Sequence, residues 1–311
     1  MRVRGCQASR AGRQRMTPLR SWLFVPGDSE RKLAKGESTG ADVLILDLED
    51  AVSADNKALA RQLVPQFLHA RPRSQRSPQL WVRINPLDSS MVLADLVAIV
   101  AAQPDGVMVP KSNGPDDLRR LSHYLDALEA QHGVAAGSIK LLPVASETPL
   151  AVFRLGQYAE AGLPRLLGIT WGAEDLSAAL GASTNVDATG QWTFTNQMAR
   201  SLALLAARAA GVQAIDTLYV NYRDEAGLRA ASRTSRAEGF TGRIAIHPAQ
   251  VAAINESYMP SQEEIEHARR VVAAFEAAAG AGTVGLDGKM LDIPHLKQAQ
   301  ATLALAAAFA R

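Results

Sequence analysis

The chain has 311 residues, of which 47% are apolar and 21% charged, an ordinary composition for a globular protein with a sizeable core. A formal net charge of +2 with dispersed basic residues argues against nucleic-acid binding, and no long uncharged apolar stretch could span a membrane. The single cysteine, Cys6, excludes an intramolecular disulfide framework and suits a reducing compartment, so we expect a cytoplasmic protein.

Residues 1–17 are rich in arginine and lack both acidic residues and an apolar stripe. We expect a disordered leader here. Two alternatives stay open, namely a transit peptide and a start upstream of the true initiator, Met16. A secretory signal is not expected, because the segment has no apolar h-region.

Eight short apolar runs punctuate the next part of the chain, at residues 21–26, 43–47, 80–84, 106–110, 140–144, 165–170, 214–220 and 243–247. Most are continuously apolar, as strands buried on both faces are. Segments with helical spacing, such as 116–131 and 196–210, lie between them. The pattern predicts an α/β protein with a (β/α)8 TIM barrel over residues 18–258. A doubly wound open sheet is the alternative, although no GxGxxG motif follows the first run.

The pattern changes after residue 258. Ser261 and Glu264 form the signature of a capping box at a helix start, and apolar residues then recur on one helical face. A glycine-rich link is expected at 280–288, followed by a second helix over about 294–310. Residues 259–311 are therefore predicted to form a helical extension or lid outside the barrel.

Polar and ionisable residues recur where the predicted strands end. In TIM barrels the active site lies at the carboxyl ends of the strands. The residues at these positions are Asp47, Glu49, Asp50, Arg83, Asn85, Lys111, Glu147, Glu174, Asp175, Asp216, Asn221 and His247. Each has a structural alternative, such as a helix cap or a solvated loop charge, but their recurrence favours a site.

Glu147 and Asp175 follow the fifth and sixth runs, which would be neighbours in the barrel. Two converging carboxylates suit Mg²⁺, which takes one or two carboxylates and keeps positions for water and substrate. The alternative is that each residue caps the helix after it. The scattered histidines give no zinc motif.

Arg83 lies near the end of an apolar strand and needs an anionic partner, because an unpaired buried charge is costly. That partner is either a substrate carboxylate or one of the acids in the segment 47–50. Farther towards the N-terminus, Arg31 and Lys32 follow Gly27 and are suited either to phosphate groups or to a solvated helix face.

Several segments in one order resemble a known family: LFVPGDSERKLAK, GADVLILDLEDAV, VRIN, GVMVPK, ETPLAV, WGAEDL, GFTGRIAIHPAQVAAIN and LDGKMLDIPH. They resemble the beta subunit of citrate lyase and its stand-alone relatives, in the HpcH/HpaI aldolase/citrate lyase family of phosphoenolpyruvate-binding barrels. The resemblance covers about residues 19–300.

The resemblance implies a Mg²⁺-dependent carbon–carbon lyase that cleaves a 3-hydroxyacyl-CoA-type thioester, citryl-, citramalyl- or malyl-CoA-like, to a keto acid and acetyl-CoA. It assigns the metal to Glu147 and Asp175, with Glu147 also beside the substrate. It assigns the substrate carboxylate to Arg83 as a catalytic residue.

The same resemblance implies further roles. Asp47 and Glu49 act as catalytic residues that order Arg83 and the metal's waters, and Arg31 and Lys32 contact the CoA. Members form homotrimers or higher multiples, in which the C-terminal extension packs over a neighbour and Asp292 reaches that neighbour's site.

Other activities than a stand-alone carbon–carbon lyase stay open. The protein could be a malyl- or citramalyl-CoA thioesterase, or the lyase subunit of a citrate lyase complex with an acyl-carrier protein. A non-catalytic scaffold barrel would be expected to lack Arg83 or the metal pair. Two departures from the family pattern stand out: Asn221 occupies a position where relatives often carry an acid, and Gly36 and Glu37 are expected to shorten the first helix.

Overall fold

The computed structural model describes residues 18–278 and 280–310, so the predicted leader at 1–17 lies outside the described residues. The chain divides into two compact units, one formed by Leu19–Tyr258 and the other containing Met259–Arg311. No helix among the described residues is long and apolar enough to cross a membrane.

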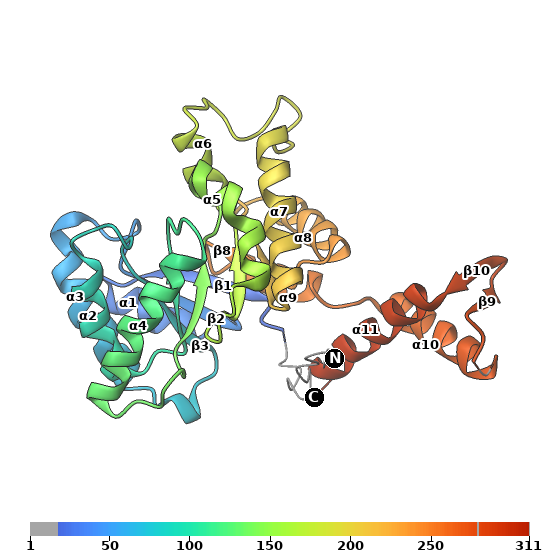
Figure 1. The fold of residues 1–311 in the computed structure, drawn as a ribbon, viewed down its shortest axis with the longest axis horizontal. Coiled ribbons are helices and arrows are strands. Elements are labelled where there is room, and N and C mark those ends of the chain that lie inside the picture. The colour runs from blue at the N-terminus through green and yellow to red at the C-terminus, as the bar shows by residue number, and fades with distance from the viewer. Residues whose placement is uncertain (1–17, 279, 311) are drawn as a thin grey trace, which may run out of the picture. The chain divides into compact units, whose positions relative to one another are not determined.

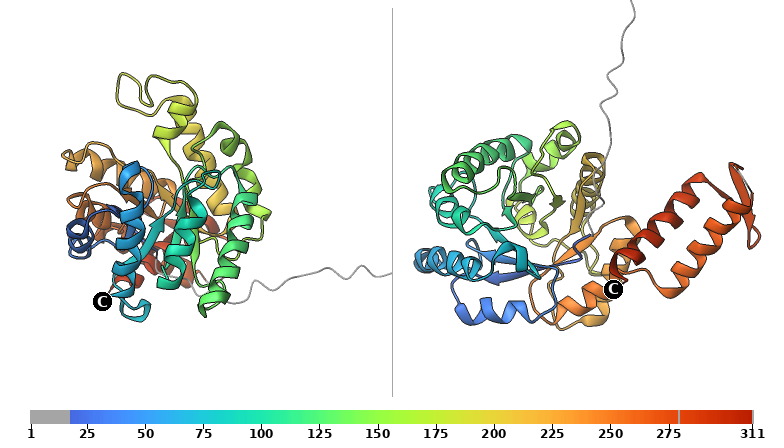
Figure 2. Two further views of the ribbon diagram at one scale, coloured as in Figure 1. Left: turned by 90° about the vertical axis from the view of Figure 1, so that its left-hand side faces the viewer. Right: turned by 90° about the horizontal axis from the view of Figure 1, so that it is seen from below.

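The first unit contains eight parallel strands: β1 (Ser21–Pro26), β2 (Val43–Asp47), β3 (Gln79–Arg83), β4 (Gly106–Val109), β5 (Lys140–Pro143), β6 (Gly168–Thr170), β7 (Gln213–Asp216) and β8 (Gly242–Ala245). Their order is β5-β4-β3-β2-β1-β8-β7-β6. Parallel bridges between Leu141 and Leu166 and between Val144 and Thr170 join β5 to β6. The sheet therefore curls into a barrel (Figures 1 and 2), which confirms the predicted TIM barrel and excludes the open sheet.

Helices and short 3-10 turns alternate with these strands. The helices are α1 (Glu30–Glu37), α2 (Lys57–His69), α3 (Val92–Ile99), α4 (Pro115–His132), α5 (Pro149–Arg154), α6 (Ala173–Ala179), α7 (Phe194–Ala210), α8 (Glu225–Glu238) and α9 (Gln250–Ser257). The 3-10 turns are Ala54–Asn56, Arg73–Gln75, Val100–Ala102 and Leu155–Glu160. The observed α1 is short, and Gly36 near its end lets the helix approach the sheet, because a Cβ there would lie 3.0 Å from Leu44 Cδ1.

The strand residues alternate between two apolar layers. Val43 and Ile45 of β2 belong to a cluster with Trp22 and Trp81, whereas Leu44 and Leu46 join the larger cluster under the helices. Side chains two apart on a strand share a face, so Asp47 continues the face of Val43 and Ile45. By the same rule Arg83 continues the face of Trp81. The strand period therefore places both charges above the inner layer, at the carboxyl end.

Close packing of two tryptophans fills the inner layer. The Trp22 and Trp81 rings meet edge to face with centroids 5.0 Å apart. A Cβ at Gly106 on β4 would lie 2.4 Å from the Trp81 ring, so a glycine is needed beside it. The base of the site thus rests on a rigid apolar floor.

Some strands are shorter than their apolar runs. The run at 214–220 predicted a strand to residue 220, but β7 ends at Asp216, where the pairing with Arg243 of β8 ends. The run at 165–170 becomes a regular strand only at Gly168, although the Arg165 carbonyl and the Leu167 N–H still bond to the backbone of Leu141 on β5. In the run at 214–220, apolar residues thus extend beyond the end of the paired ladder.

The C-terminal unit contains α10 (Gln262–Ala277), β9 (Thr283–Leu286), β10 (Lys289–Asp292) and α11 (Ile293–Phe309). The capping box of Ser261 and Glu264 at the start of α10 is present as predicted. The prediction of a glycine-rich link was wrong, because β9 and β10 pair as an antiparallel hairpin. Asp287 and Gly288 both have positive φ, as a two-residue hairpin turn requires.

Candidate active site

Asp47 and Arg83 are register partners on β2 and β3 and form the base of the candidate site. Arg83 Nε donates to Asp47 Oδ1 at 2.7 Å, and its Nη2 donates to Oδ2 at 2.5 Å. Arg83 Nη1 also lies 3.0 Å from Glu49 Oε2. The anionic partner of Arg83 is therefore found inside the protein, which was one of the two alternatives for this residue.

The turn after β2 holds the Asp47 carboxylate in place. Its two oxygens accept hydrogen bonds from the backbone N–H groups of Glu49 and Ala51, at 2.9 and 3.0 Å. Burial opposes the charge on Arg83, but the bonds to Asp47 and the charge of Glu49 raise the pKa of Arg83. The guanidinium is thus a fixed cation, which also lies over the Phe24 ring.

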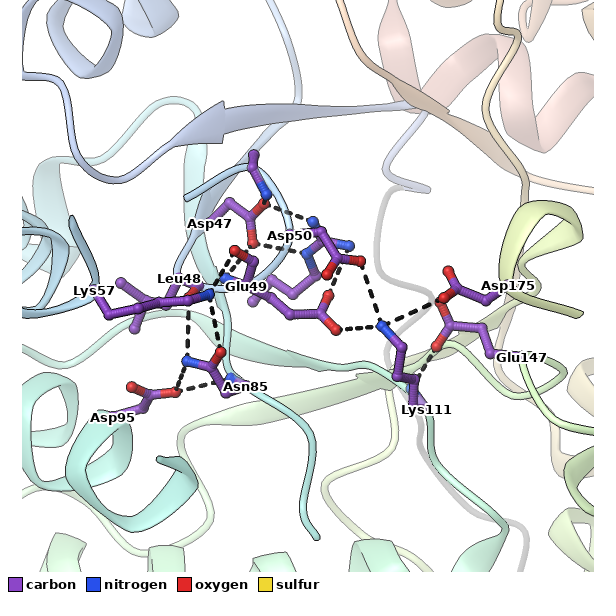
Figure 3. A network of polar contacts seen from close by, with 12 residues as sticks. Asp47, Leu48, Glu49, Asp50, Lys57, Asn85, Asp95, Lys111, Glu147 and Asp175 are labelled. Atoms are coloured by element: carbon purple, nitrogen blue, oxygen red, sulfur yellow. Dashed lines mark hydrogen bonds and ion pairs between the residues drawn. The ribbon is translucent and has the colours of Figure 1, made fainter. Parts of the chain in front are cut away.

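Lys111, directly after the strand β4 and Pro110, connects the acids of the site (Figure 3). Its ammonium lies 2.6 Å from Glu49 Oε1, 3.3 Å from Asp50 Oδ2 and 3.4 Å from Asp175 Oδ1. Its backbone N–H donates to Glu147 Oε2. The residue has a positive φ of 50°, a left-handed conformation that is uncommon for lysine. Strained backbone of this kind is often found at functional sites. Lys111 combines it with contacts to the acids through both its backbone N–H and its ammonium group.

Glu147 and Asp175 come together at the carboxyl ends of β5 and β6, and both approach Lys111. The alternative that they are helix caps was wrong, because Thr148 caps α5 and Gly172 occupies the N-cap position of α6. Gly172 makes room for Glu147, since a Cβ there would lie 2.8 Å from Glu147 Cγ.

Burial and charge together perturb the acids. Glu147 is only 5% exposed, and burial, with the nearby charges of Asp175 and Glu49, raises the pKa of Glu147 to about 8. Burial also raises the pKa of Glu49, although Arg83 and Lys111 oppose this change. Burial opposes the charge on Lys111, yet its bond to Glu49 and the surrounding carboxylates raise the pKa of Lys111.

The donor set fits a divalent cation. The acids that meet at this mouth are Asp47, Glu49, Asp50, Glu147 and Asp175, and the cations among them are Arg83 and Lys111. Even with Glu147 protonated, the other four carboxylates outnumber the two cations, and a dication would relieve this excess of negative charge. No group of three or more His, Cys, Asp or Glu side chains converges within residues 18–278 and 280–310, so a cation here would rely on Glu147 and Asp175 with water and substrate.

A support network behind the site was missed by the sequence reasoning. Lys57, the first residue of α2, donates to the backbone carbonyls of Leu48 and Glu49, both at 2.7 Å, and to Asn85 Oδ1 at 3.0 Å. Asn85 in turn donates to Asp95 Oδ2 at 2.7 Å. The network fixes the turn that carries Glu49 (Figure 3), and no local pattern around a helix-start lysine marks it.

Three further residues named from the sequence, Arg31, Lys32 and Asp216, do not contact Arg83 or Lys111 in the hydrogen bonds and ion pairs described above. Arg31 and Lys32 are exposed in the first turns of α1, after β1. Asp216 is buried, where Arg243 and Arg200 hold the pKa of its carboxyl down at about 2 even though burial opposes this, so it is a structural ion-pair centre.

Asp292 belongs to the C-terminal unit, where it stands at the N-cap of α11. Its Oδ1 lies 2.5 Å from His295 Nδ1, and this hydrogen bond lowers the pKa of Asp292.

The fold and the site define a TIM-barrel protein with an acidic mouth, suited to a divalent cation, at the carboxyl ends of its strands. Residues 20–248 match the family described as HpcH/HpaI aldolase/citrate lyase, and the chain belongs to this family, as its motifs predicted.

Its relatives include enzymes with different reactions. The chain is 37% identical over 295 residues to the (3S)-malyl-CoA thioesterase of Cereibacter sphaeroides, with 94% of this chain and 96% of the relative covered. It is 38% identical over 289 residues to citrate lyase subunit beta of Escherichia coli, with 92% and 93% covered. Among solved structures, the CitE protein of Mycobacterium tuberculosis in complex with magnesium, acetoacetate and coenzyme A has a TM-score of 0.78 at 32% identity, over 93% of this chain and 98% of that one.

Proposed function

We propose that the protein is a Mg²⁺-dependent carbon–carbon lyase that cleaves a 3-hydroxyacyl-CoA-type thioester into a keto acid and acetyl-CoA. The observation that carries this proposal is the fixed Arg83 guanidinium at the same mouth as the converging carboxylates of Glu147 and Asp175. The relatives support the substrate class, because one acts on malyl-CoA and a CitE structure contains magnesium with coenzyme A.

Glu147 and Asp175 would hold the metal, which when bound supplies a Lewis acid for the oxygens of a hydroxy or keto acid. Arg83 would bind the substrate carboxylate and stabilise negative charge on the neighbouring oxygen. Asp47 and Glu49 would keep Arg83 oriented, since they already contact its guanidinium in the chain alone.

The reaction breaks the bond between the hydroxyl-bearing carbon and the α-carbon of the thioester. A base removes the hydroxyl proton, the oxygen forms the carbonyl of the keto acid, and the electron pair of the broken bond passes to the α-carbon as a thioester enolate. Protonation of that carbon gives acetyl-CoA. We assign this proton transfer to Asp292 of a neighbouring copy in a homotrimer or higher multiple.

The remaining assignments follow from the same proposal. Arg31 and Lys32 would contact the CoA, residues 259–311 would act as a lid, and the protein would work in the cytoplasm. Thioester hydrolysis is the second candidate, favoured by the similarity to a malyl-CoA thioesterase. A third possibility, a lyase subunit that uses an acyl-carrier protein, is favoured by the similarity to citrate lyase subunit beta.

The test is product analysis on malyl-, citramalyl- and citryl-CoA, with Mg²⁺ or with a chelator. Metal-dependent release of keto acid and acetyl-CoA, lost in Asp175→Ala, is the expected result. Glu174→Ala is the matched control, because the Glu174 carboxylate contacts Asn185 instead of Lys111. Free CoA without keto acid would make the protein a thioesterase. Turnover only after addition of an acylated carrier protein would make it a complex subunit.

A further inference from the structure

A serine hydroxyl joins the two segments that carry the proposed metal ligands, just beyond the ends of β5 and β6. At the strand ends the contacts are made by the backbone: Val144 bridges Thr170, and the Ala145 N–H donates to the Thr170 carbonyl at 2.9 Å. One step farther the Gly172 N–H donates to Ser146 Oγ at 3.2 Å. The acceptor at this step is a side chain, which extends the contact between the two segments past the ladder.

This hydrogen bond lies close in sequence to both ligands. Ser146 directly precedes Glu147, and Gly172 is the N-cap residue of α6, whose first turn contains Asp175. Ser146 is 0% exposed, so water does not replace the bond, and a buried N–H left without a partner is costly. The bond between Ser146 and Gly172 therefore fixes the distance between the two ligand-bearing segments (Figure 3 shows the two carboxylates).

The start of α6 has a second anchor on the side of β7. Trp171, which directly follows β6, is 1% exposed, and its indole Nε1 donates to Asp216 Oδ1 at 2.7 Å. Asp216 is itself held by Arg243 Nη2 at 2.9 Å and by Arg200 Nη2 at 3.0 Å. The Trp192 ring packs edge to face on the indole, with centroids 5.3 Å apart. The buried ion-pair centre thus immobilises the residue from which α6 begins.

Fixed spacing between two carboxylates matters more for a small cation than for a large one. Mg²⁺ demands near-octahedral geometry with oxygens at about 2.0–2.1 Å, whereas Ca²⁺ accepts irregular geometry at about 2.3–2.6 Å. The protein sets the positions of Glu147 and Asp175, and water and substrate adapt to them. Rigid anchors behind these two residues therefore favour Mg²⁺, and looser anchors would remove that preference.

We propose that Ser146 and Trp171 are positioning residues, which set the separation of Glu147 and Asp175 and thereby make the site prefer Mg²⁺ to larger dications. This inference rests on the proposed function, because it takes Glu147 and Asp175 as the metal ligands. It adds the means by which the chain selects its metal, built from a hydroxyl and an indole N–H behind the ligands.

The test is calorimetric titration of the full chain with Mg²⁺ and, separately, with Ca²⁺. Loss of a group that orients a metal ligand predicts about tenfold weaker Mg²⁺ binding in Ser146→Ala. Ca²⁺ affinity should stay within about twofold of wild type, because its coordination is flexible. Trp171→Phe keeps an aromatic ring and removes the indole N–H, and it should change the two affinities in the same way.

The matched control is Ser232→Ala on α8. Ser232 is also 0% exposed, but its hydroxyl has no hydrogen-bond partner among residues 18–278 and 280–310. This variant should bind both cations as the wild type does. Urea denaturation in the presence of a chelator shows whether each variant folds, and the two positioning variants alter different segments, so each tests the proposal without the other.

The outcomes separate this inference from the proposed function. Unchanged Mg²⁺ affinity in both positioning variants would overturn the inference and leave the lyase proposal intact. An equal loss for Mg²⁺ and Ca²⁺ would also overturn it, because the residues would then support the site without selecting the metal. A wild-type protein that binds no Mg²⁺ would overturn the metal-dependent lyase itself, and the positioning roles with it.

Discussion

Two buried glutamates at opposite ends of the barrel behave in opposite ways. Glu129 lies near the amino ends of β5 and β6, where Arg165 donates to both of its oxygens at 2.8 and 2.6 Å. Backbone N–H groups of Gly137 and Ile139 add two further bonds, and together these donors lower the pKa of Glu129 although burial opposes the change.

Glu147 lies at the carboxyl ends of the same two strands. It accepts a hydrogen bond from the Lys111 backbone N–H but faces the charges of Asp175 and Glu49, and burial raises the pKa of Glu147 to about 8. The two residues show that burial alone does not distinguish a structural carboxylate from one in a functional site. A buried carboxylate with a full set of donors stabilises the fold, whereas one surrounded by other acids is suited to bind a cation.

The largest expected effect is that of Glu147→Gln on activity, with little change in stability. Glu147→Gln should lower kcat/KM by about a thousandfold, because it removes a charged metal ligand, worth several kcal/mol to the transition state. The free energy of unfolding of the metal-free protein should change by less than about 1 kcal/mol at pH 7, since a group with a pKa of about 8 is already mostly protonated. Steady-state kinetics and urea denaturation measure the two quantities, and a strongly destabilised variant would contradict the comparison.

Glu129→Gln should show the reverse behaviour. Loss of one partner of a buried ion pair leaves Arg165 incompletely compensated, and we expect the free energy of unfolding to fall by about 3 kcal/mol. Asp126 also pairs with Arg165, which limits the loss. The kcat of the folded fraction should stay within about twofold of wild type, and urea denaturation with kinetics at low temperature measures both. A large drop in kcat without destabilisation would refute a structural role.

Metal affinity should depend on pH through Glu147. The raised pKa means that this carboxyl binds a proton below about pH 8, and a cation must displace that proton. Apparent Mg²⁺ affinity should therefore rise about 20-fold from pH 6.5 to 8.5 and level off above that range. Calorimetric titration at several pH values measures it, with Asp116→Asn on exposed α4 as a variant that should keep the same profile. A flat profile would remove Glu147 from the cation site.

The smallest effect concerns the space beside Glu147. Gly172→Ala would place a Cβ 2.8 Å from Glu147 Cγ, so the buried side chain must shift. We expect about fivefold weaker Mg²⁺ binding from this overpacking. Gly156→Ala is the matched control, because a Cβ at Gly156 meets nothing within 4 Å. Equal affinities in the two variants would show that the position of Glu147 is not critical.

The amino-acid sequence by itself determined the barrel, because each strand carries its own apolar run and each helix its own periodicity. It also determined the residue types at the strand ends, and the order of its motifs determined the family. These features are local, or repeat at regular intervals, and so can be predicted without knowing which strands pair. The hairpin β9–β10 escaped prediction because four glycines between residues 280 and 288 give few apolar positions to mark the strands.

Only the tertiary structure decided which charges meet. Arg83 pairs with Asp47 36 positions earlier in the chain, and Lys111 contacts Glu49 from 62 positions away. The support given by Lys57 to the Leu48 and Glu49 carbonyls and the stack of Tyr222 on His247 likewise depend on how neighbouring loops meet. Such contacts form when the closed ring brings the strand ends together, and no spacing in the sequence records them.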